Sequence, residues 1–230
     1  LGGGGITVNS GAGNATLGTS TASLLVEASA SQTWTNNATT TLNSRRLGAS
    51  NTATGPVTVT LNAASTGTIS FSLAVTDSPD TTKKLALVID SAGTGNVSMV
   101  TSTFTGGLFV KRGLLSSSGN MGGGSVLLGD TSGSNDARIN LTGIATNNIT
   151  VQAGGSGLAA LTGSGSGDYQ GTITMNRDLS IGSVSSTNQT IAYSGAISGA
   201  GNLTIGRVAT GTSNPTVTVS GASNSYRGET

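Results

Sequence analysis

Short stretches in which hydrophobic and polar residues alternate recur along the chain, and Gly, Asn or Ser separates each stretch from the next. Such alternation is typical of β-strands, and no segment has the i, i+3, i+4, i+7 apolar spacing of an amphipathic helix. The pattern therefore predicts an all-β protein. The expected strands are Ile6–Val8, Ala15–Leu17, Leu24–Val26, Thr33–Thr35, Thr39–Leu42, Val57–Leu61, Thr68–Val75, Leu85–Ile89, Leu108–Leu115, Ser125–Leu128, Arg138–Leu141, Ile149–Val151, Leu158–Leu161 and Thr172–Ile181.

Strand spacing alone allows a sandwich, a barrel or a β-helix. Very short strands, Asn and Gly at the corners, and a repeated aromatic-x-Gly step favour a parallel β-helix. The step occurs at Phe104-Thr105-Gly106, Tyr169-Gln170-Gly171 and Tyr226-Arg227-Gly228, at intervals of roughly sixty residues. With around 20 residues per turn we expect on the order of ten turns, built as one β-helical segment over residues 1–230.

Composition narrows the function classes. Only 8% of the residues are charged, 3% are aromatic and the net charge is +1, while 37 of 230 are glycine. A core with so few aromatic side chains is typical of a narrow solenoid. The many β-branched residues argue against disorder. The absence of Cys and His removes disulfides and the commonest transition-metal ligands. The chain has no basic stripe of the kind that binds nucleic acid. No run of apolar residues reaches the roughly 20 residues that are needed to span a membrane.

The chain begins at Leu1, with neither an initiator Met nor a signal peptide. We interpret it as an internal or processed piece of a longer protein.

Two stretches near the end carry a resemblance to a known family. In YSGAISGAGNLTIG the matching residues are Ile197-Ser198-Gly199, Gly201 and Leu203-Thr204, and in TVTVSGASNSYRG they are Val219-Ser220-Gly221, Asn224, Tyr226 and Gly228. Together they resemble the autotransporter-associated β-strand repeat, also called the passenger-associated transport repeat. Ser102–Leu115 and Asp168–Ile181 are similar to its continuation, so residues 96–230 are closest to the family and residues 1–95 are more diverged.

The resemblance implies a right-handed β-helical stalk of a secreted or surface-displayed bacterial protein, with no implied catalysis. The chain departs from the family pattern in its long connector Arg207–Pro215, in Leu108, and in Arg227 and Glu229, which stand where small polar residues are usual.

Candidate ligand contacts are few. Trp34, the only tryptophan, is interpreted as core or end cap, with a sugar-stacking platform as the alternative. The charged segment Asp77–Lys84 is interpreted as a solvated turn in which Pro79 stops the strand, and a ligand contact through Asp77, Asp80, Lys83 and Lys84 is the alternative. Tyr169 is a further candidate contact for a surface glycan.

Catalytic and metal sites have little support. The nine acids contain no adjacent pair, whereas glycosidases need two carboxylates across one bond. Asp130-x-Ser132-x-Ser134-x-Asp136 spaces its oxygens like a calcium loop but lacks the later Glu, so a plain turn is the preferred interpretation. The glycine strings precede no GK[ST] and no helix, which argues against phosphate binding. We predict no enzyme activity, no metal and no cofactor.

The predicted function is therefore a structural extracellular or cell-surface segment that forms a stalk, matrix fibre or filament. An adhesin that binds glycan on the same scaffold is the alternative, and a polysaccharide-active enzyme is a remote one. Neither end looks like a polar cap, so we expect partners to be other copies stacked end to end, or neighbouring turns of a longer chain.

Overall fold

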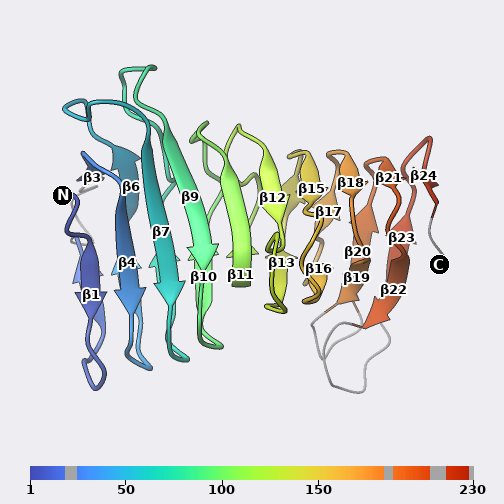
Figure 1. The fold of residues 1–230 in the computed structure, drawn as a ribbon, viewed down its shortest axis with the longest axis horizontal. Coiled ribbons are helices and arrows are strands. Elements are labelled where there is room, and N and C mark those ends of the chain that lie inside the picture. Colours follow the sequence, from blue (N-terminus) through green and yellow to red (C-terminus); the bar gives the residue numbers. More distant parts are fainter. Residues whose placement is uncertain (19–24, 184–188, 208–215, 228–230) are drawn as a thin grey trace. The chain divides into compact units, whose positions relative to one another are not determined.

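A computed structural model describes residues 1–18, 25–183, 189–207 and 216–227. Within these residues the protein is all-β, with no helix, and its parallel strands stack as a β-solenoid of about 8 turns (Figure 1). The predicted fold class is confirmed. Leu24, most of the connector Arg207–Pro215, and Gly228 and Glu229 lie outside the described residues.

Contacts between residues divide the chain into two compact units. The first contains Leu1–Phe109, Gly113–Leu115 and Met121–Gly124, and the second contains Val110–Arg112, Ser116–Asn120 and Ser125–Thr230. The strand β11 (Leu108–Ser117) has residues in both units.

The first unit has three columns of parallel strands. The first column is β1 (Ile6–Val8), β4 (Gln32–Asn36), β7 (Val57–Ala63) and β9 (Leu85–Asp90). The second column is β2 (Ala15–Leu17), β5 (Leu42–Ser44), β8 (Ile69–Phe71) and β10 (Asn96–Met99). The third is the pair β3 (Leu25–Ala28) and β6 (Arg46–Ala49), which an isolated bridge from Gly48 to Thr76 extends.

The second unit repeats this arrangement. Its first column is β12 (Val126–Leu128), β15 (Ile149–Val151), β18 (Ile173–Met175), β21 (Ile197–Gly199) and β24 (Ser225–Tyr226). Its second is β13 (Ala137–Leu141), β16 (Ala159–Gly163), β19 (Leu179–Ser183) and β22 (Leu203–Arg207). Its third is β14 (Ile144–Ala145), β17 (Asp168–Tyr169), β20 (Thr190–Tyr193) and β23 (Thr216–Val219).

Most turns are longer than the sequence predicts. Hydrogen-bonded partners on successive turns are 27 residues apart at Ser31 and Thr58 and 28 apart at Asp77 and Thr105. In the second unit the separation varies: it is 20 between Ala160 and Ser180 and 24 between Asn148 and Thr172. The expected turn of around 20 residues agrees with the pairing of β16 and β19 but is too short for most turns, because the corners take more residues than the short strands reveal.

The core is made of inward side chains stacked in register. In the second unit Val126 pairs with Ile149, Ile149 with Ile173 and Ile173 with Ile197, and all four are buried. Burying such a side chain contributes roughly 1.5–3 kcal/mol. Because each turn adds only a few inward residues, the stability of the solenoid depends on contacts between successive turns.

Corner residues join one turn to the next. The Oδ1 atom of Asn148 accepts hydrogen bonds from the backbone N–H and the hydroxyl of Thr172, at 3.0 and 2.9 Å. Asn120 accepts the same pair of bonds from Thr146. These bonds satisfy backbone donors at positions where the strand ladder stops. They account for the Asn residues that the sequence places at the corners.

Glycines form a second kind of corner. A Cβ on Gly171 would overlap the carbonyl of Asn147, one on Gly195 would overlap the carbonyl of Gly171, and one on Gly221 would overlap that of Gly195. The backbones of these turns therefore approach too closely for any side chain.

Several predicted boundaries were wrong. Thr39–Thr41 is a corner rather than a strand, and β5 begins at Leu42. The stretch predicted at Thr68–Val75 holds only the three residues of β8. The run Thr172–Ile181 divides into β18 and β19, which the corner Asn176–Asp178 separates. The strands not predicted individually are β6, β10, β14, β17 and β20 to β24.

The aromatic-x-Gly step is not the structural repeat that the sequence predicts. Tyr169 pairs with Tyr193, one turn later, so Tyr193-Ser194-Gly195 is a member of the set that the sequence analysis missed. Tyr226 lies in β24 and its neighbour is Gly199, in another column. The interval of roughly sixty residues spans more than one turn and does not mark the period of the fold.

Candidate functional site

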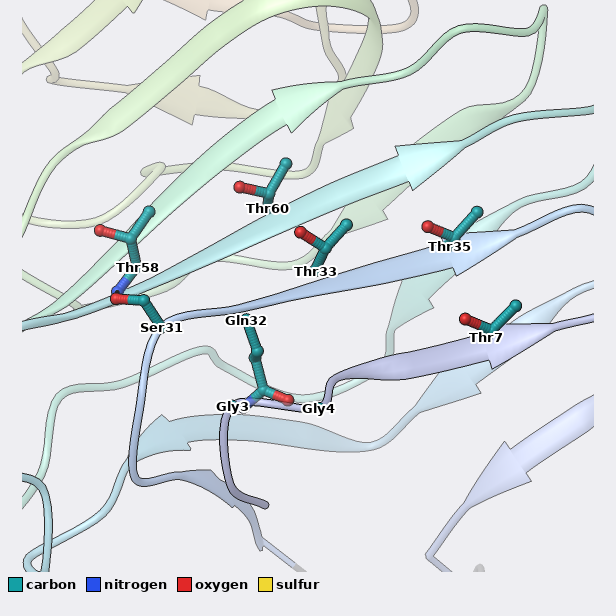
Figure 2. A pocket seen from close by; sticks show the side chains of 9 residues that line it. All are labelled: Gly3, Gly4, Thr7, Ser31, Gln32, Thr33, Thr35, Thr58 and Thr60. Carbon is teal, nitrogen blue, oxygen red and sulfur yellow. Dashed lines mark hydrogen bonds between the residues drawn. The ribbon is translucent and has the colours of Figure 1, made fainter.

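A shallow groove of about 470 Å³ lies on the outer side of the first column in the first unit (Figure 2). Its volume falls within the range of ordinary small-molecule sites, roughly 300–1,000 Å³. No charged and no aromatic side chain lines this groove, which is formed by Gly3, Gly4, Thr7, Ser31, Gln32, Thr33, Thr35, Thr58 and Thr60.

Strand alternation produces the array of hydroxyl groups in the groove. The inward residues of β4 are buried, whereas Thr33 and Thr35 point outward. Thr60 on β7 is in register with Thr33, and Thr35 is in register with Thr7 on β1. Figure 2 shows the threonine side chains of β4 and β7 on one side of these strands. Successive strands lie about 4.8 Å apart, so the hydroxyls form closely spaced rows.

Gln32 differs from the other lining residues because its side chain is buried, at 6% exposure. Its Oε1 accepts a hydrogen bond of 3.2 Å from the indole Nε1 of Trp34. Its Nε2 is buried and has no hydrogen-bond partner among the described residues. A buried donor without a partner costs about 1–3 kcal/mol. Alternation places Gln32 on the inward face of β4 together with Trp34, so this amide does not face the threonine rows of the groove.

Trp34 is a core residue. Its exposure is 0%, and its ring lies 5.9 Å from the ring of Phe71, measured between centroids. A fully buried indole has no face on which a sugar could stack, so the alternative interpretation of Trp34 as a platform was wrong. The cause is alternation within β4, which turns Trp34 inward between the outward threonines.

Tyr169 is also buried, at 1% exposure, and is no ligand contact. Its ring stacks on that of Tyr193 with 5.1 Å between centroids and 7° between planes. Its hydroxyl donates toward the carbonyls of Thr162 at 2.7 Å and Ile139 at 3.1 Å. The hydroxyl of Tyr193 donates to the carbonyl of Leu161 at 2.6 Å and accepts from the N–H of Gly182 at 3.1 Å.

Burial raises the pKa of both tyrosines, because the phenolate would lose its hydration. For Tyr169 the adjacent Tyr193 raises the pKa further, while the backbone of Thr162 lowers it. Both side chains are therefore neutral hydrogen-bond donors that tie successive turns together.

The Asp77–Lys84 segment is a turn in which Asp77 has a structural role. The carboxylate of Asp77 accepts hydrogen bonds from the N–H of Leu85 at 2.7 Å and from the N–H and hydroxyl of Thr105 on the next turn. Asp80 is exposed, and the hydroxyl and N–H of Thr82 donate to its carboxylate and lower the pKa of this group. The backbone N–H of Asp80 donates to Asn51 on the preceding turn. Lys84 is exposed and Lys83 is half-buried. The groove includes none of these residues.

The Asp130–Asp136 loop, whose spacing is similar to that of a calcium loop, is bonded to the protein itself. Asp130 accepts from the N–H of Thr131 at 2.8 Å, and Asp136 accepts from the N–H of Leu158 at 2.8 Å, one turn on. The guanidinium of Arg177 covers Gly129, where a Cβ would overlap its Nη2. A cation is therefore already present beside this loop. Over the described ranges no group of three His, Cys, Asp or Glu could hold a metal ion.

Sequence reasoning missed the groove, although a signal was present. The Thr-x-Thr pairs at 33–35 and 58–60 mark outward positions of two strands, but only the pairing register places them side by side. The glycine run Gly2–Gly5 is typical of a corner, yet Gly3 and Gly4 line the groove.

Comparisons of the chain with protein-family models, curated proteins and solved structures gave no match. The resemblance to the autotransporter-associated repeat therefore stays a prediction. No helix among the described residues is long and apolar enough to cross a membrane. Fold and site together define a parallel β-solenoid with a neutral, hydroxyl-lined groove on one face.

Proposed function

We propose that this chain is a structural β-solenoid segment that acts as a stalk or fibre scaffold. The observation that supports this proposal most is how polar and aromatic side chains are used. Asp77, Asn148 and Tyr193 bond to a neighbouring turn rather than converge on a reaction centre. Polar side chains that bond one turn to the next stabilise the stacking of the turns, which is the property that a scaffold requires.

An extracellular or cell-surface location in a bacterium is part of the same proposal. It is supported by the low content of charged residues, the many Gly, Ser, Thr and Asn residues, and the resemblance of residues 96–230 to the autotransporter-associated repeat. Protease accessibility on intact cells that produce the protein would test this location. Digestion only after lysis would contradict it.

Removing one whole turn tests the scaffold role. Deleting residues 149–172 joins Asn148 to Ile173, which occupies the position of Ile149 one turn later. A modular scaffold should keep its β-sheet circular dichroism and cooperative melting after this deletion. Spin labels at Leu127 and Thr174 should then approach by one strand spacing, about 4.8 Å. Deleting half of the same turn is the matched control and should abolish folding, and failure of both deletions would contradict a modular scaffold.

End-to-end association is a further part of the proposal. Within the described residues β1 pairs only with β4, so one edge of β1 presents unpaired backbone groups. Such an edge favours addition of another strand. Electron microscopy of the isolated chain should show filaments that lengthen with concentration. Dispersed monomers at high concentration would exclude autonomous polymerisation and leave stacking within a longer chain.

A glycan-binding adhesin is the second candidate function, and the hydroxyl-lined groove over β4 and β7 is the observation that favours it. A glycan array probed with the intact chain should give a reproducible hit if this function is present. The remote alternative, a polysaccharide-active enzyme, would require turnover of uronate polymers, and we expect no product from these polymers.

A further inference from the structure

The outward face of β9 differs from that of β7, the strand beside it in the first column (Figure 1). Alternation turns Ala86 and Val88 outward, whereas the outward positions of β7 that pair with them are Thr58 and Thr60. The run Leu85–Ile89 therefore contains no polar residue. Such a run is typical of a parallel strand that is covered on both faces. Ala86 and Val88 are only half-buried within this chain, which leaves their side of β9 available to a partner.

Phe109 extends this apolar face onto β11. It is half-buried and points outward, whereas the other two phenylalanines of the chain are buried in the core. The strand β11 pairs with β9, and the N–H of Leu87 donates to the carbonyl of Gly107 at 3.0 Å. In a parallel ladder this bond places Phe109 beside Val88. All these residues belong to the first unit.

Opposite charges stand at the two ends of the face. Lys84 directly precedes β9, and its carbonyl accepts a hydrogen bond of 2.8 Å from the N–H of Val57, so the ladder with β7 includes it. Lys84 is exposed, and Asp90, the last residue of β9, is half-buried on the same outward side. The two lie about 20 Å apart along an extended strand. The outward row is thus basic, apolar, apolar and acidic, in the order Lys84, Ala86, Val88, Asp90.

We propose that the face formed by Ala86, Val88 and Phe109 binds a second copy of the chain, with the two sheets face to face and their β9 strands antiparallel. Lys84 of each copy then lies opposite Asp90 of the other copy. A parallel arrangement would instead bring like charges together at both ends, and such contacts disfavour an interface. The contact uses the outer face of β9 and not the edge of β1, so it stands or fails separately from end-to-end association.

The apolar side chains are complementary in the same arrangement. With a two-fold axis at the level of Leu87, Val88 of one copy faces the smaller Ala86 of the other. Phe109 faces Gly107, whose lack of a side chain leaves space for the ring. The outward threonines of β7 face each other and can exchange hydrogen bonds between their hydroxyl groups. Charge, size and hydrogen bonding thus favour one and the same register.

The size of the face predicts a weak association. Three strands about 4.8 Å apart and about 20 Å long cover roughly 300 Å², compared with about 800 Å² per partner in a stable complex. Asp90 already has an interaction within its own chain, and exposed ion pairs contribute little to affinity. The charges therefore select the register, while the apolar contact supplies the affinity. Copies held side by side on a surface or in a fibre would associate more strongly, because their contacts act together.

Sedimentation velocity of the intact chain over a concentration series tests the face. The unchanged chain should form a dimer at high concentration. Val88→Thr/Phe109→Thr gives both positions the residue type of β7, and this variant should keep its β-sheet circular dichroism and remain monomeric. Thr174→Ser, an outward change in the second unit, is the matched control and should dimerise like the unchanged chain. A chain that is monomeric at every concentration, or a dimer that survives both threonine substitutions, would overturn the proposal.

Charge reversal tests the register and leaves the apolar residues in place. Lys84→Asp and Asp90→Lys should each weaken the dimer by roughly tenfold, because each brings like charges together at both ends of the contact. Lys84→Asp/Asp90→Lys restores both pairs and the net charge of the chain, so it should dimerise like the unchanged chain. If the single variants dimerise as well as the unchanged chain, or the double variant is as weak as either of them, the antiparallel arrangement is wrong.

Discussion

At the scale of single residues, the tyrosine hydroxyls are among the most constrained polar groups. Tyr193→Phe keeps the ring stack with Tyr169 but leaves the carbonyl of Leu161 and the N–H of Gly182 without their partner in the core. We expect the free energy of unfolding to fall by about 1–3 kcal/mol, because these groups stay buried. Guanidinium denaturation followed by circular dichroism would measure this loss. Thr174→Val, which changes an outward residue of β18, should stay within about 0.5 kcal/mol.

The same pair gives the protein a pH dependence at high pH. The folded-state pKa of each tyrosine is raised above its value of 10.0 in the unfolded chain, so the folded state holds its protons more tightly. Stability is then unaffected below about pH 10 and falls as pH rises above it, by up to about 1.4 kcal/mol per pH unit for each group. Denaturation at a series of alkaline pH values should show this slope, and Tyr193→Phe should reduce it. An unchanged slope in the variant would contradict the assignment.

At the scale of elements, the glycine column predicts a steep cost for one added methyl group. In Gly195→Ala the new Cβ would overlap the carbonyl of Gly171, which a well-paired turn cannot move away. We expect a loss of about 1–3 kcal/mol or more, as for overpacked sites. Gly206→Ala, where no atom lies within 4 Å of the added Cβ, is the control. Equal melting temperatures for the two variants would mean that the corner can relax.

The elements also show how far the sequence could predict the fold. Strands with clean alternation, such as β7, are predicted within about two residues of their ends, because one buried face imposes the period of two. The strand β6 was not predicted, because hydrophobic and polar residues do not alternate in Arg46-Leu47-Gly48-Ala49. A larger residue at position 48 would be crowded by Leu25 and Thr76, which lie close to Gly48. Thr39–Thr41 resembles a strand by composition, yet Thr40 bonds to the carbonyl of Ala12 at a corner.

The groove could be predicted less well than the fold. Trp34 and Tyr169 are candidates by sequence because aromatic rings commonly bind sugars, but the phase of alternation in each strand decides which side such a ring takes. That phase was readable for β4, where threonines flank Trp34 on both sides. The pairing of Thr33 with Thr60 was not readable, because it depends on a turn length of 27 residues that only the corners determine.

At the scale of the whole molecule, stability should be a sum of contributions from neighbouring turns. The core columns of the two units consist of separate sets of residues, and β15, β18 and β21 are paired within the second unit. A defect in one turn should therefore loosen its neighbours more than distant turns. This behaviour differs from that of a globular domain, in which one shared core makes unfolding all-or-none.

Ile173→Ala tests this expectation. Ile173 is fully buried between Ile149 and Ile197, so its truncation should cost about 2–5 kcal/mol. Amide hydrogen exchange followed by mass spectrometry should show faster exchange in peptides that contain β15, β18 and β21, while peptides of β4 and β7 keep their rates. Leu61→Ala in β7 is the reciprocal control and should give the opposite distribution. Equal acceleration in all peptides for both variants would show that the chain unfolds as one cooperative unit, and the nearest-neighbour description would then be wrong.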